Sequence, residues 1–463
     1  MSRRFLRIGI LVLALAMVGA ACGDDDDAAD TTTTAAETTT TTTAETTTTA
    51  AETTTTAAET TTTTAAPSGL TCGDGITVGV ITDQTGALAI YGAHILRGVP
   101  IGFEYATGAP ADGDVYMVED CPVRVLYRDD QGNPELSATA ARELIEVEGA
   151  EILIGTVSSG VTATLQEIAR ENDVILIAAP AAANDLTGST FNPNTFRASR
   201  NNYQDGIAIC EYLTQEYNTF VQIAPDYSFG YGGAQAYRDS CTFFGGEFVA
   251  EDVYAPADTT DFTPYMEQFV DVDADALLVT WAGGGFVPLL QAAIDLGVLD
   301  NIVLGSPFVD NIVMPAFFSN AIGSTASIIY HYTAPDNAIN DFLVEKVAEY
   351  FGTFPDLFDA DGMNAAIMTI EAIKASGGDA SADALRDVLE GMTFEGPKGT
   401  VYIRPEDHVA IQDMYVVTLL NVDDPEFKYY EYVTTLRPEP PCLLEGEYLD
   451  RCGDLPVGSL SGS

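Results

Sequence analysis

The order of apolar runs and amphipathic segments in this chain predicts parallel β-sheet. The apolar runs Ile152–Ile154 and Val174–Ala178 flank Val161–Arg170, whose apolar positions recur with the period of a helix. A strand, a helix and a strand in that order form a βαβ unit, which requires parallel pairing. Small and hydroxyl residues follow the two strands, in 155–160 and 180–184, at the sheet edge where open α/β folds bind ligands. Ordinary tight turns with a serine N-cap explain these loops equally well.

The same alternation continues along most of the chain. Further strands are predicted at Ile76–Thr82, Val123–Tyr127, Phe220–Ala224, Glu247–Val253, Ala276–Thr280 and Ile302–Leu304. Helices are predicted between them, and two more, at 341–351 and 361–375, precede antiparallel strands at 400–403 and 414–420. This order predicts an α/β fold of two doubly wound parallel sheets that are joined by several crossings and separated by a cleft.

The N-terminus is typical of an export signal. Three arginines within the first seven residues precede the apolar run Ile8–Ala21, which is too short to span a bilayer comfortably. The following Gly19-Ala20-Ala21-Cys22 resembles a lipoprotein processing site, at which Cys22 would be lipidated and become the new N-terminus. The sequence therefore predicts a lipoprotein signal peptide over residues 1–22 and a lipid anchor on the outer face of the cytoplasmic membrane. Plain secretion, with Cys22 free or removed, is the alternative.

Residues 23–71 are predicted to be a disordered tether. After an aspartate run at 24–27, threonine tracts broken by Ala-Ala-Glu contain no apolar residue larger than Ala, so they cannot bury a core. A flexible chain of this length spans roughly 40 Å. Such a tether would hold the folded body away from a membrane surface.

Composition narrows the possible partners. The chain has 69 acidic and 19 basic residues, which gives a formal net charge of −50. A surface this acidic argues against nucleic acid or an anionic membrane face as a partner.

Besides Cys22 the chain contains six cysteines, and an even number in an exported chain favours disulfides. The first two precede runs predicted to be neighbouring strands, the next two lie on helices that flank one strand, and the last two close a short loop. The predicted pairs are Cys72–Cys121, Cys210–Cys241 and Cys442–Cys452. The three histidines lie far apart and no Cys-x-x-Cys occurs, so neither a structural zinc nor another metal is expected.

Several motifs, taken in order, cover nearly all of the body. They include ITVGVITDQTGALAIYG (76–92), VLYRDDQGNPELSATAARELI (125–145), ILIGTVSSGVTATLQEIA (152–169), ILIAAPAAANDLTG (175–188), FRASRNNYQDGIAICEYL (196–213), APDYSFGYG (224–232) and TFEGPKGTVYIRPEDH (393–408). The ordered set resembles the type I periplasmic-binding-protein fold, in the branched-chain amino acid (leucine/isoleucine/valine-binding) family of ABC-transporter solute-binding proteins. The resemblance implies a monomer without cofactor that closes two lobes over a small molecule and delivers it to a permease.

The resemblance also implies a division of the body into two lobes joined by a multi-strand hinge. The first lobe would comprise residues 72–196 and 332–398, and the second 197–331 and 399–452. Residues 453–463 would form a polar tail.

The family's ligand site transfers onto positions at both sides of the expected cleft. Ser159 and the backbone of the Ala181–Ala183 turn match groups that hold a ligand carboxylate, and Tyr91 matches an aromatic that lines the cleft. The full set of expected ligand-binding residues is Thr85, Tyr91, Ser158, Ser159, Ala181, Ala183, Phe229, Trp281 and Ser306.

Three departures from the family pattern leave the chemical identity of the ligand undecided. A family threonine falls on Ala183, a frequent tyrosine on Phe229, and the acid that pairs with an α-ammonium on Pro307. Because an unpaired buried charge is very costly, a zwitterionic ligand would need Asp310 or Asp226 as a substitute. The expected ligand is a branched-chain or other amino acid, or a small aromatic or aliphatic acid or amide.

Two other classes of protein compete with this hypothesis. An enzyme is not expected, because Gly-x-Ser-x-Gly does not occur and the three histidines are scattered. A ligand-sensing receptor component with the same fold is the stronger alternative.

Overall fold

The computed structural model describes residues 69–306 and 310–462. The predicted signal peptide, the lipidation site Cys22, the tether up to residue 68 and Pro307 lie outside the described residues. In the body, the predicted α/β architecture with two parallel sheets is confirmed.

The first sheet has six strands in the order β2-β3-β1-β4-β5-β6. Their bounds are β1 Ile76–Thr82, β2 Val115–Val118, β3 Cys121–Asp129, β4 Ala150–Gly155, β5 Ile175–Ala178 and β6 Thr195–Arg197. All pairings are parallel except that of the edge strand β2 with β3. Helices cover both faces, so central strands such as β5 are buried along their whole length and consist of apolar residues alone.

Helices from two distant parts of the chain pack on this sheet. The early ones are α1 Ala89–Thr107, α2 Pro134–Arg142 and α3 Ser159–Glu171, and the late ones are α9 Ala338–Phe351, α10 Asp359–Ala375 and α11 Ala382–Leu389. Helices α1 and α10 approach so closely that a Cβ atom on Gly98 would lie 2.1 Å from the carbonyl oxygen of Asp359. Glycine at this position therefore sets the distance between the two helices and places the start of α10 beside α1.

The second sheet is built in the same way around β7 Thr219–Pro225. Its order is β11-β10-β7-β8, with β9 also paired to β7, and the other bounds are β8 Glu247–Phe248, β9 Val253–Ala255, β10 Ala276–Val279 and β11 Val303–Gly305. The main helices of this lobe are α4 Asn202–Leu213, α5 Ser228–Phe243 and α7 Phe286–Asp295. The single strand predicted at Glu247–Val253 is wrong, because residues 249–252 leave the sheet and divide it into β8 and β9.

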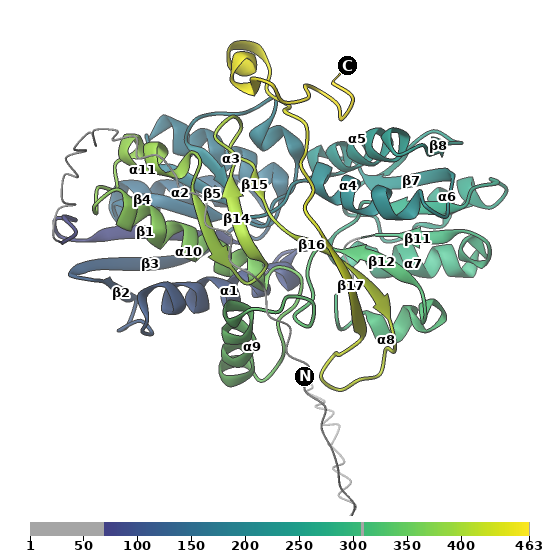
Figure 1. The fold of residues 1–463 in the computed structure, drawn as a ribbon, viewed down its shortest axis with the longest axis horizontal. Helices are drawn as coiled ribbons and strands as arrows, with labels where there is room; N and C mark the ends of the chain where they lie inside the picture. Colours follow the sequence, from purple (N-terminus) through teal and green to yellow (C-terminus); the bar gives the residue numbers. More distant parts are fainter. Residues whose placement is uncertain (1–68, 307–309, 463) are drawn as a thin grey trace, which may run out of the picture. The chain divides into compact units, whose positions relative to one another are not determined.

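Two small antiparallel sheets complete the body (Figure 1). One contains β12 Thr325–Ile328, β16 Met414–Leu419 and β17 Tyr430–Leu436; the other contains β13 Thr393–Gly396, β14 Gly399–Ile403 and β15 Ala410–Ile411. The lobe boundary predicted between residues 398 and 399 falls inside the β13–β14 hairpin. Val401 and Ile403 of β14 are buried in the same core cluster as strands of the first sheet.

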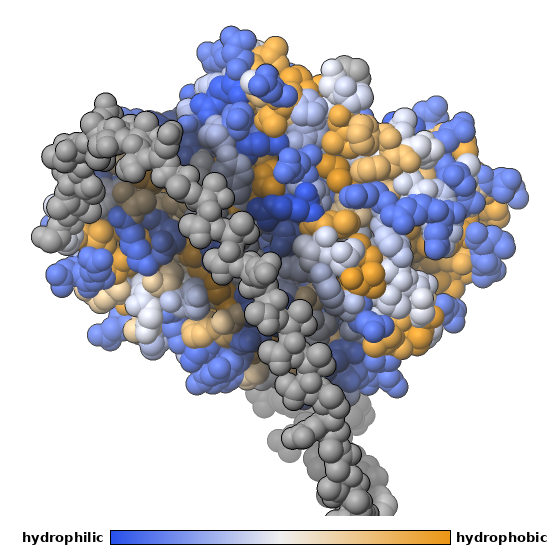
Figure 2. All heavy atoms as spheres, viewed as in Figure 1, coloured by the Kyte–Doolittle hydropathy of each residue, from blue (hydrophilic) through white to orange (hydrophobic). Residues whose placement is uncertain are grey.

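The three predicted disulfides, Cys72–Cys121, Cys210–Cys241 and Cys442–Cys452, are all present. Hydrophilic and hydrophobic side chains are interspersed over the face that Figure 2 shows. Within the described residues, every helix is too short or too polar to cross a membrane.

Candidate functional site

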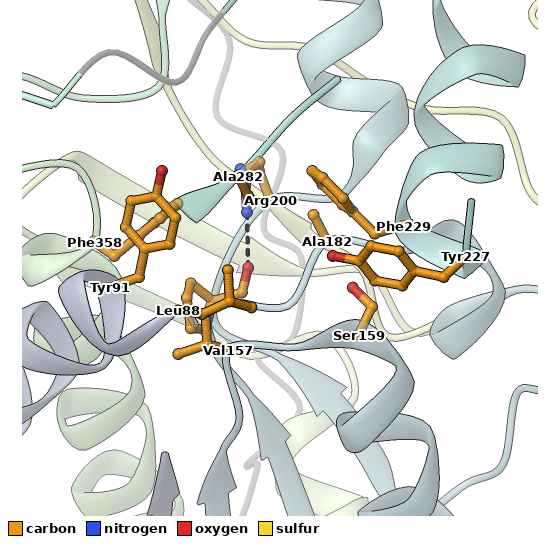
Figure 3. A pocket seen from close by; sticks show the side chains of 11 residues that line it. Leu88, Tyr91, Val157, Ser159, Ala182, Arg200, Tyr227, Phe229, Ala282 and Phe358 are labelled. Carbon is orange, nitrogen blue, oxygen red and sulfur yellow. Dashed lines mark hydrogen bonds between the residues drawn. The ribbon is translucent and has the colours of Figure 1, made fainter. Parts of the chain in front are cut away.

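A cavity of about 320 Å³, including its open mouth, lies where the carboxyl ends of strands from both sheets meet. Figure 3 shows the residues that line it. They are Leu88, Tyr91, Val157, Ser159, Pro180, Ala182, Arg200, Tyr227, Phe229, Ala282 and Phe358.

Four helices begin at this cavity. Leu88, Tyr227 and Phe358 are the N-cap residues of α1, α5 and α10, and Ser159 is the first residue of α3. The N-terminus of a helix carries a partial positive charge and presents N–H groups without intrahelical acceptors. The convergence of four such ends makes the cavity favourable for an anionic group.

Ser159 and the Pro180–Ala183 turn form the most polar part of the wall. The backbone N–H of Ala183 donates to Ser159 Oγ at 3.1 Å, which leaves the serine hydroxyl hydrogen available to donate elsewhere. The N–H groups of Ala181 and Ala182 have no acceptor among the described residues. This part of the wall can therefore donate several hydrogen bonds to one ligand oxygen pair.

The conformation of this turn is fixed from behind, because all four of its carbonyl groups accept hydrogen bonds. Arg197 donates through Nη1 to Ala181 O at 2.7 Å and through Nη2 to Ala183 O. Arg200 Nη1 donates to Pro180 O at 2.8 Å, which is the dashed line in Figure 3, and the Asn202 N–H donates to Ala182 O at 2.8 Å. Because the carbonyl groups are held on the side away from the cavity, the N–H groups of the turn can face the cavity.

Arg200 brings a buried positive charge to the cavity wall. Its side chain is 1% exposed, and its guanidinium lies 5.1 Å from the centre of the Phe358 ring. Nε donates to Asp205 Oδ1 at 3.2 Å. Burial raises the pKa of Asp205 to about 6, although the charges of Arg200 and Lys398 oppose that rise.

Aromatic rings form the apolar walls from both lobes. Tyr91 and Phe358 make an edge contact with ring centres 5.0 Å apart, and Tyr227 and Phe229 lie 5.9 Å apart. In Figure 3 the first pair stands on one side of the cavity and the second on the other. A flat or branched apolar body between these rings would replace water with favourable contacts.

Of the nine expected site residues, Tyr91, Ser159 and Phe229 line the cavity, and Ala181 and Ala183 belong to its turn. Thr85 is exposed and donates to Asp129 Oδ2 at 2.6 Å, outside the cavity wall. Ser158 is the N-cap residue of α3 and makes no side-chain capping bond. Ser306 is partly buried beyond the end of β11 and is not a lining residue.

The structure places Trp281 in the core of the second lobe instead of on the cavity wall. It is 1% exposed and packs edge-on against Phe262 with ring centres 4.8 Å apart. Its neighbour Ala282 lines the cavity. Residues 277, 279 and 281 alternate onto one face of β10 and its extension, and all three lie in the same core.

The two candidate substitutes for the missing acid lie in different surroundings. Asp226 is exposed and accepts a hydrogen bond from the Tyr231 hydroxyl. Asp310 is 4% exposed and accepts from the Tyr91 hydroxyl at 3.4 Å, so it stands behind the wall and does not line it.

Sequence reasoning did not single out seven of the lining residues. These are Leu88, Val157, Pro180, Arg200, Tyr227, Ala282 and Phe358. Five of them directly adjoin an expected site residue or lie within three positions of one, so the sequence indicates the correct loops but not the side chains that face the cavity. Phe358 gave no local signal, because its place depends on the packing of α10 against α1.

Two clusters of acidic side chains lie close together among the described residues, and none of their members lines the cavity. The carboxylates of Asp83, Asp129 and Asp130 lie close together, but each accepts hydrogen bonds from N–H or O–H donors of nearby loops. His94 lies near two acids, yet its Nδ1 accepts from the Phe358 N–H at 3.4 Å, which puts the ring proton on Nε2. None of the three histidines lines the cavity.

Comparisons with known proteins agree with this architecture. A family model described as periplasmic binding protein matches residues 75–423. The Leu/Ile/Val-binding protein homolog 6 of Brucella abortus (strain 2308) is 27% identical over 391 residues, which cover 80% of this chain and 94% of that protein. A second model, the New glue protein family, matches residues 6–74, which are mostly the threonine-rich tracts.

Solved structures extend the comparison. The crystal structure of an ABC-type branched-chain amino acid transporter from Rhodopseudomonas palustris CGA009 is 30% identical, with a TM-score of 0.65 and coverage of 78% of this chain and 96% of that one. A solute-binding protein from R. palustris in complex with 4-hydroxybenzoate shares the fold at 23% identity, with a TM-score of 0.71 and coverage of 79% and 98%. Because the family model spans most of the body in a single match, this chain belongs to the periplasmic binding protein family, the non-enzymatic solute-binding proteins of ABC transporters.

Proposed function

We propose that this protein captures a small carboxylate with an aromatic or branched aliphatic body and delivers it to an ABC permease. The observation that supports this most is the convergence of four helix N-termini on a cavity whose polar wall includes the Ser159 hydroxyl, the turn N–H groups and Arg200. None of the lining residues is an acid.

The choice of an acid over an amino acid follows from the same wall. An α-ammonium desolvated in this cavity would need a carboxylate or several acceptors. The nearest acid behind the wall, Asp310, is already in contact with the Tyr91 hydroxyl. Relatives of both kinds exist, since one similar protein is named for Leu, Ile and Val and structures of this fold hold benzoate or 4-hydroxybenzoate.

Capture would proceed by closure of the two lobes. The cavity walls come from both sheets, so a ligand at Ser159 contacts the second lobe only when the lobes are together. Because the ligand makes contacts in the closed form that it lacks in the open form, binding shifts the equilibrium between the two forms toward the closed one.

The test is a thermal-shift and calorimetric comparison of matched ligands. 4-Hydroxybenzoate against 4-hydroxybenzamide tests the carboxylate, and 4-methylpentanoate against leucine tests the ammonium. A ligand at 100 times its Kd should stabilise the body by about 2.7 kcal/mol. We expect the acids to bind more tightly than the amide and than leucine. Tighter binding of leucine would show that Asp310 supplies an ammonium site and would contradict the proposal.

We also propose that Cys22 carries a lipid anchor and that residues 1–22 direct export. The support is the short apolar run followed by Gly19-Ala20-Ala21-Cys22. Cys22→Ala should release the protein from membranes into the medium. Retention of that variant on membranes would contradict the anchor.

A further inference from the structure

Beside the cavity, a segment of the second lobe contacts the first lobe directly. The Tyr91 hydroxyl accepts from the Gly283 N–H at 3.2 Å and donates to Asp310 Oδ2 at 3.4 Å. The Asn311 N–H donates to Asp356 Oδ2 at 3.1 Å. Gly283, Asp310 and Asn311 belong to the second lobe, whereas Tyr91 and Asp356 belong to the first, so these bonds form only when the lobes are closed.

This contact brings two carboxyl groups together. An oxygen of Asp310, an oxygen of Asp356 and a ring nitrogen of His94 all lie within 4.8 Å of one another. Asp310 is 4% exposed, and its Oδ1 has no hydrogen-bond partner among the described residues. Asp356 keeps a small part of its surface exposed and accepts from the N–H groups of Leu357 and Asn311.

Among the described residues, neither Asp310 nor Asp356 forms a direct ion pair with a cation. The charge of Arg97 acts on Asp356, but the Nε and Nη2 atoms of Arg97 donate to Asp359 at 2.8 and 2.6 Å, so Asp359 is its direct partner. Burial lowers the pKa of His94 well below its usual value, which leaves the ring neutral. The other titratable groups that face the pair are Asp359, whose charge also raises the pKa of Asp356, and the hydroxyls of Tyr91, Tyr330, Tyr429 and Tyr430, which are neutral at physiological pH.

We infer that Asp310 and Asp356 share a proton when the lobes close, so that closure of this binding protein takes up a proton and is favoured at acidic pH. Two carboxylates this close in a poorly solvated site cannot both be ionised without a counter-ion. When the lobes separate, each acid regains water and its ordinary acidity. The inference rests on the closure mechanism proposed above and adds a condition to it.

The direction of the pH effect follows from the pKa values of Asp310 and Asp356 in the closed state. Burial raises the pKa of Asp310 to about 6, and burial together with the charge of Asp310 raises the pKa of Asp356 to about 8. A pKa raised in the closed state means that the closed state is favoured in full at low pH and loses that advantage as the pH rises through the raised values. With one proton coupled, the closure constant should fall about tenfold per pH unit between roughly pH 6 and 8 and level off above.

The test is hydrogen–deuterium exchange on the full-length chain without ligand, corrected for the intrinsic pH dependence of exchange. The reporters are the amides of Asn311 and Gly283, which donate across the lobes. We expect their protection to fall about tenfold per pH unit between about pH 6 and 8. The amide of Val78, inside the first core, should stay protected throughout.

Asp356→Asn removes the shared proton and keeps an oxygen acceptor. In this variant, the exchange protection of the Asn311 and Gly283 amides at pH 8 should remain close to their protection at pH 6. If Asp356→Asn does not fold, Asp310→Asn takes its place with the same expected result. The matched control Asp341→Asn, at an exposed aspartate of α9, should follow the wild type.

Three results would overturn the inference. The first is equal protection of the two reporter amides at pH 6 and pH 8 in the wild type. The second is a pH dependence that is unchanged in the folded Asp→Asn variants. The third is restoration of protection at pH 8 by Mg²⁺, Ca²⁺ or Zn²⁺, which would assign a metal in place of the proton. None of these readouts needs a ligand, so failure here is distinct from failure of the carboxylate screen.

Discussion

At the Pro180–Ala183 turn every backbone carbonyl accepts a hydrogen bond, whereas at the contact between Asp310 and Asp356 neither carboxyl forms a direct ion pair with a cation among the described residues. The carbonyls of the turn are held by Arg197 at the end of β6, by Arg200 and by Asn202 at the start of α4, so the chain segment that follows the first sheet fixes the turn's donors in place. The acid pair exists only across the two lobes. Preorganised donors favour ligand affinity at any pH, whereas the acid pair makes closure of the lobes depend on pH.

The largest effect should be a loss of stability when Arg197, which holds the carbonyl groups of the turn, is replaced. Arg197 is fully buried and makes three hydrogen bonds, to Thr187 Oγ1, Ala181 O and Ala183 O. Arg197→Met leaves these acceptors unpaired beside Asp185, which should lower the free energy of unfolding by about 3–5 kcal/mol. Urea denaturation measures this.

The matched control is Arg170→Met, which breaks only an exposed pair with Glu167. That change should cost less than about 1 kcal/mol. Equal costs for the two variants would show that the turn does not depend on its arginine.

A smaller loss should follow when the turn keeps its shape and loses one ligand donor. Ser159→Ala removes the hydroxyl that lines the cavity and accepts from the Ala183 N–H. A hydrogen bond to a charged group is worth about 1.5–3 kcal/mol, so affinity for a carboxylate should fall roughly ten- to hundredfold. Calorimetry with the best acid from the ligand comparison measures this.

Ser158→Ala is the control for that variant, because Ser158 neither lines the cavity nor caps α3 with its side chain. It should bind almost as tightly as the wild type. A loss for Ser158→Ala that matches the loss for Ser159→Ala would place the carboxylate elsewhere.

The smallest effect should come from a neutral contact between the lobes. Asn184 Nδ2 donates to Gly232 O at 3.0 Å, and its Oδ1 accepts from the Tyr203 N–H. Asn184→Ala should weaken ligand binding by about 0.5–1.5 kcal/mol. Because no charge is involved, the loss should be the same at pH 6 and pH 8, in contrast to Asp356→Asn. A loss that changes with pH would mean that the acid pair is not the source of the pH dependence.

Much of the fold could be predicted because local pattern and long-range order agree. Alternating strands and amphipathic helices predicted two parallel sheets, and the places of the cysteines relative to those elements predicted all three disulfides. The failures were local. Glu247–Val253 has strand composition throughout, yet only its two ends pair with β7, because pairing depends on the path of the neighbouring strand.

The site could be predicted at the level of loops and not of side chains. Trp281 and Ala282 are neighbours on one loop, and which of them faces the cavity depends on the alternation along β10. Both faces of this strand are covered, so polarity along the sequence gives no indication of its orientation. Arg200 looked like an ordinary loop residue, because its partners Pro180 and Asp205 are brought together only by the fold.

The central claim is that a ligand carboxylate binds at Ser159 and the Pro180–Ala183 turn. The most direct measurement is a crystal structure of the body with the acid that gives the largest thermal shift. We predict a carboxylate oxygen within hydrogen-bonding distance of Ser159 Oγ and of the Ala181 or Ala182 N–H, with the apolar body between the rings of Tyr91 and Phe229. A ligand whose carboxylate points away from this turn, or one bound outside the cavity, would contradict the account.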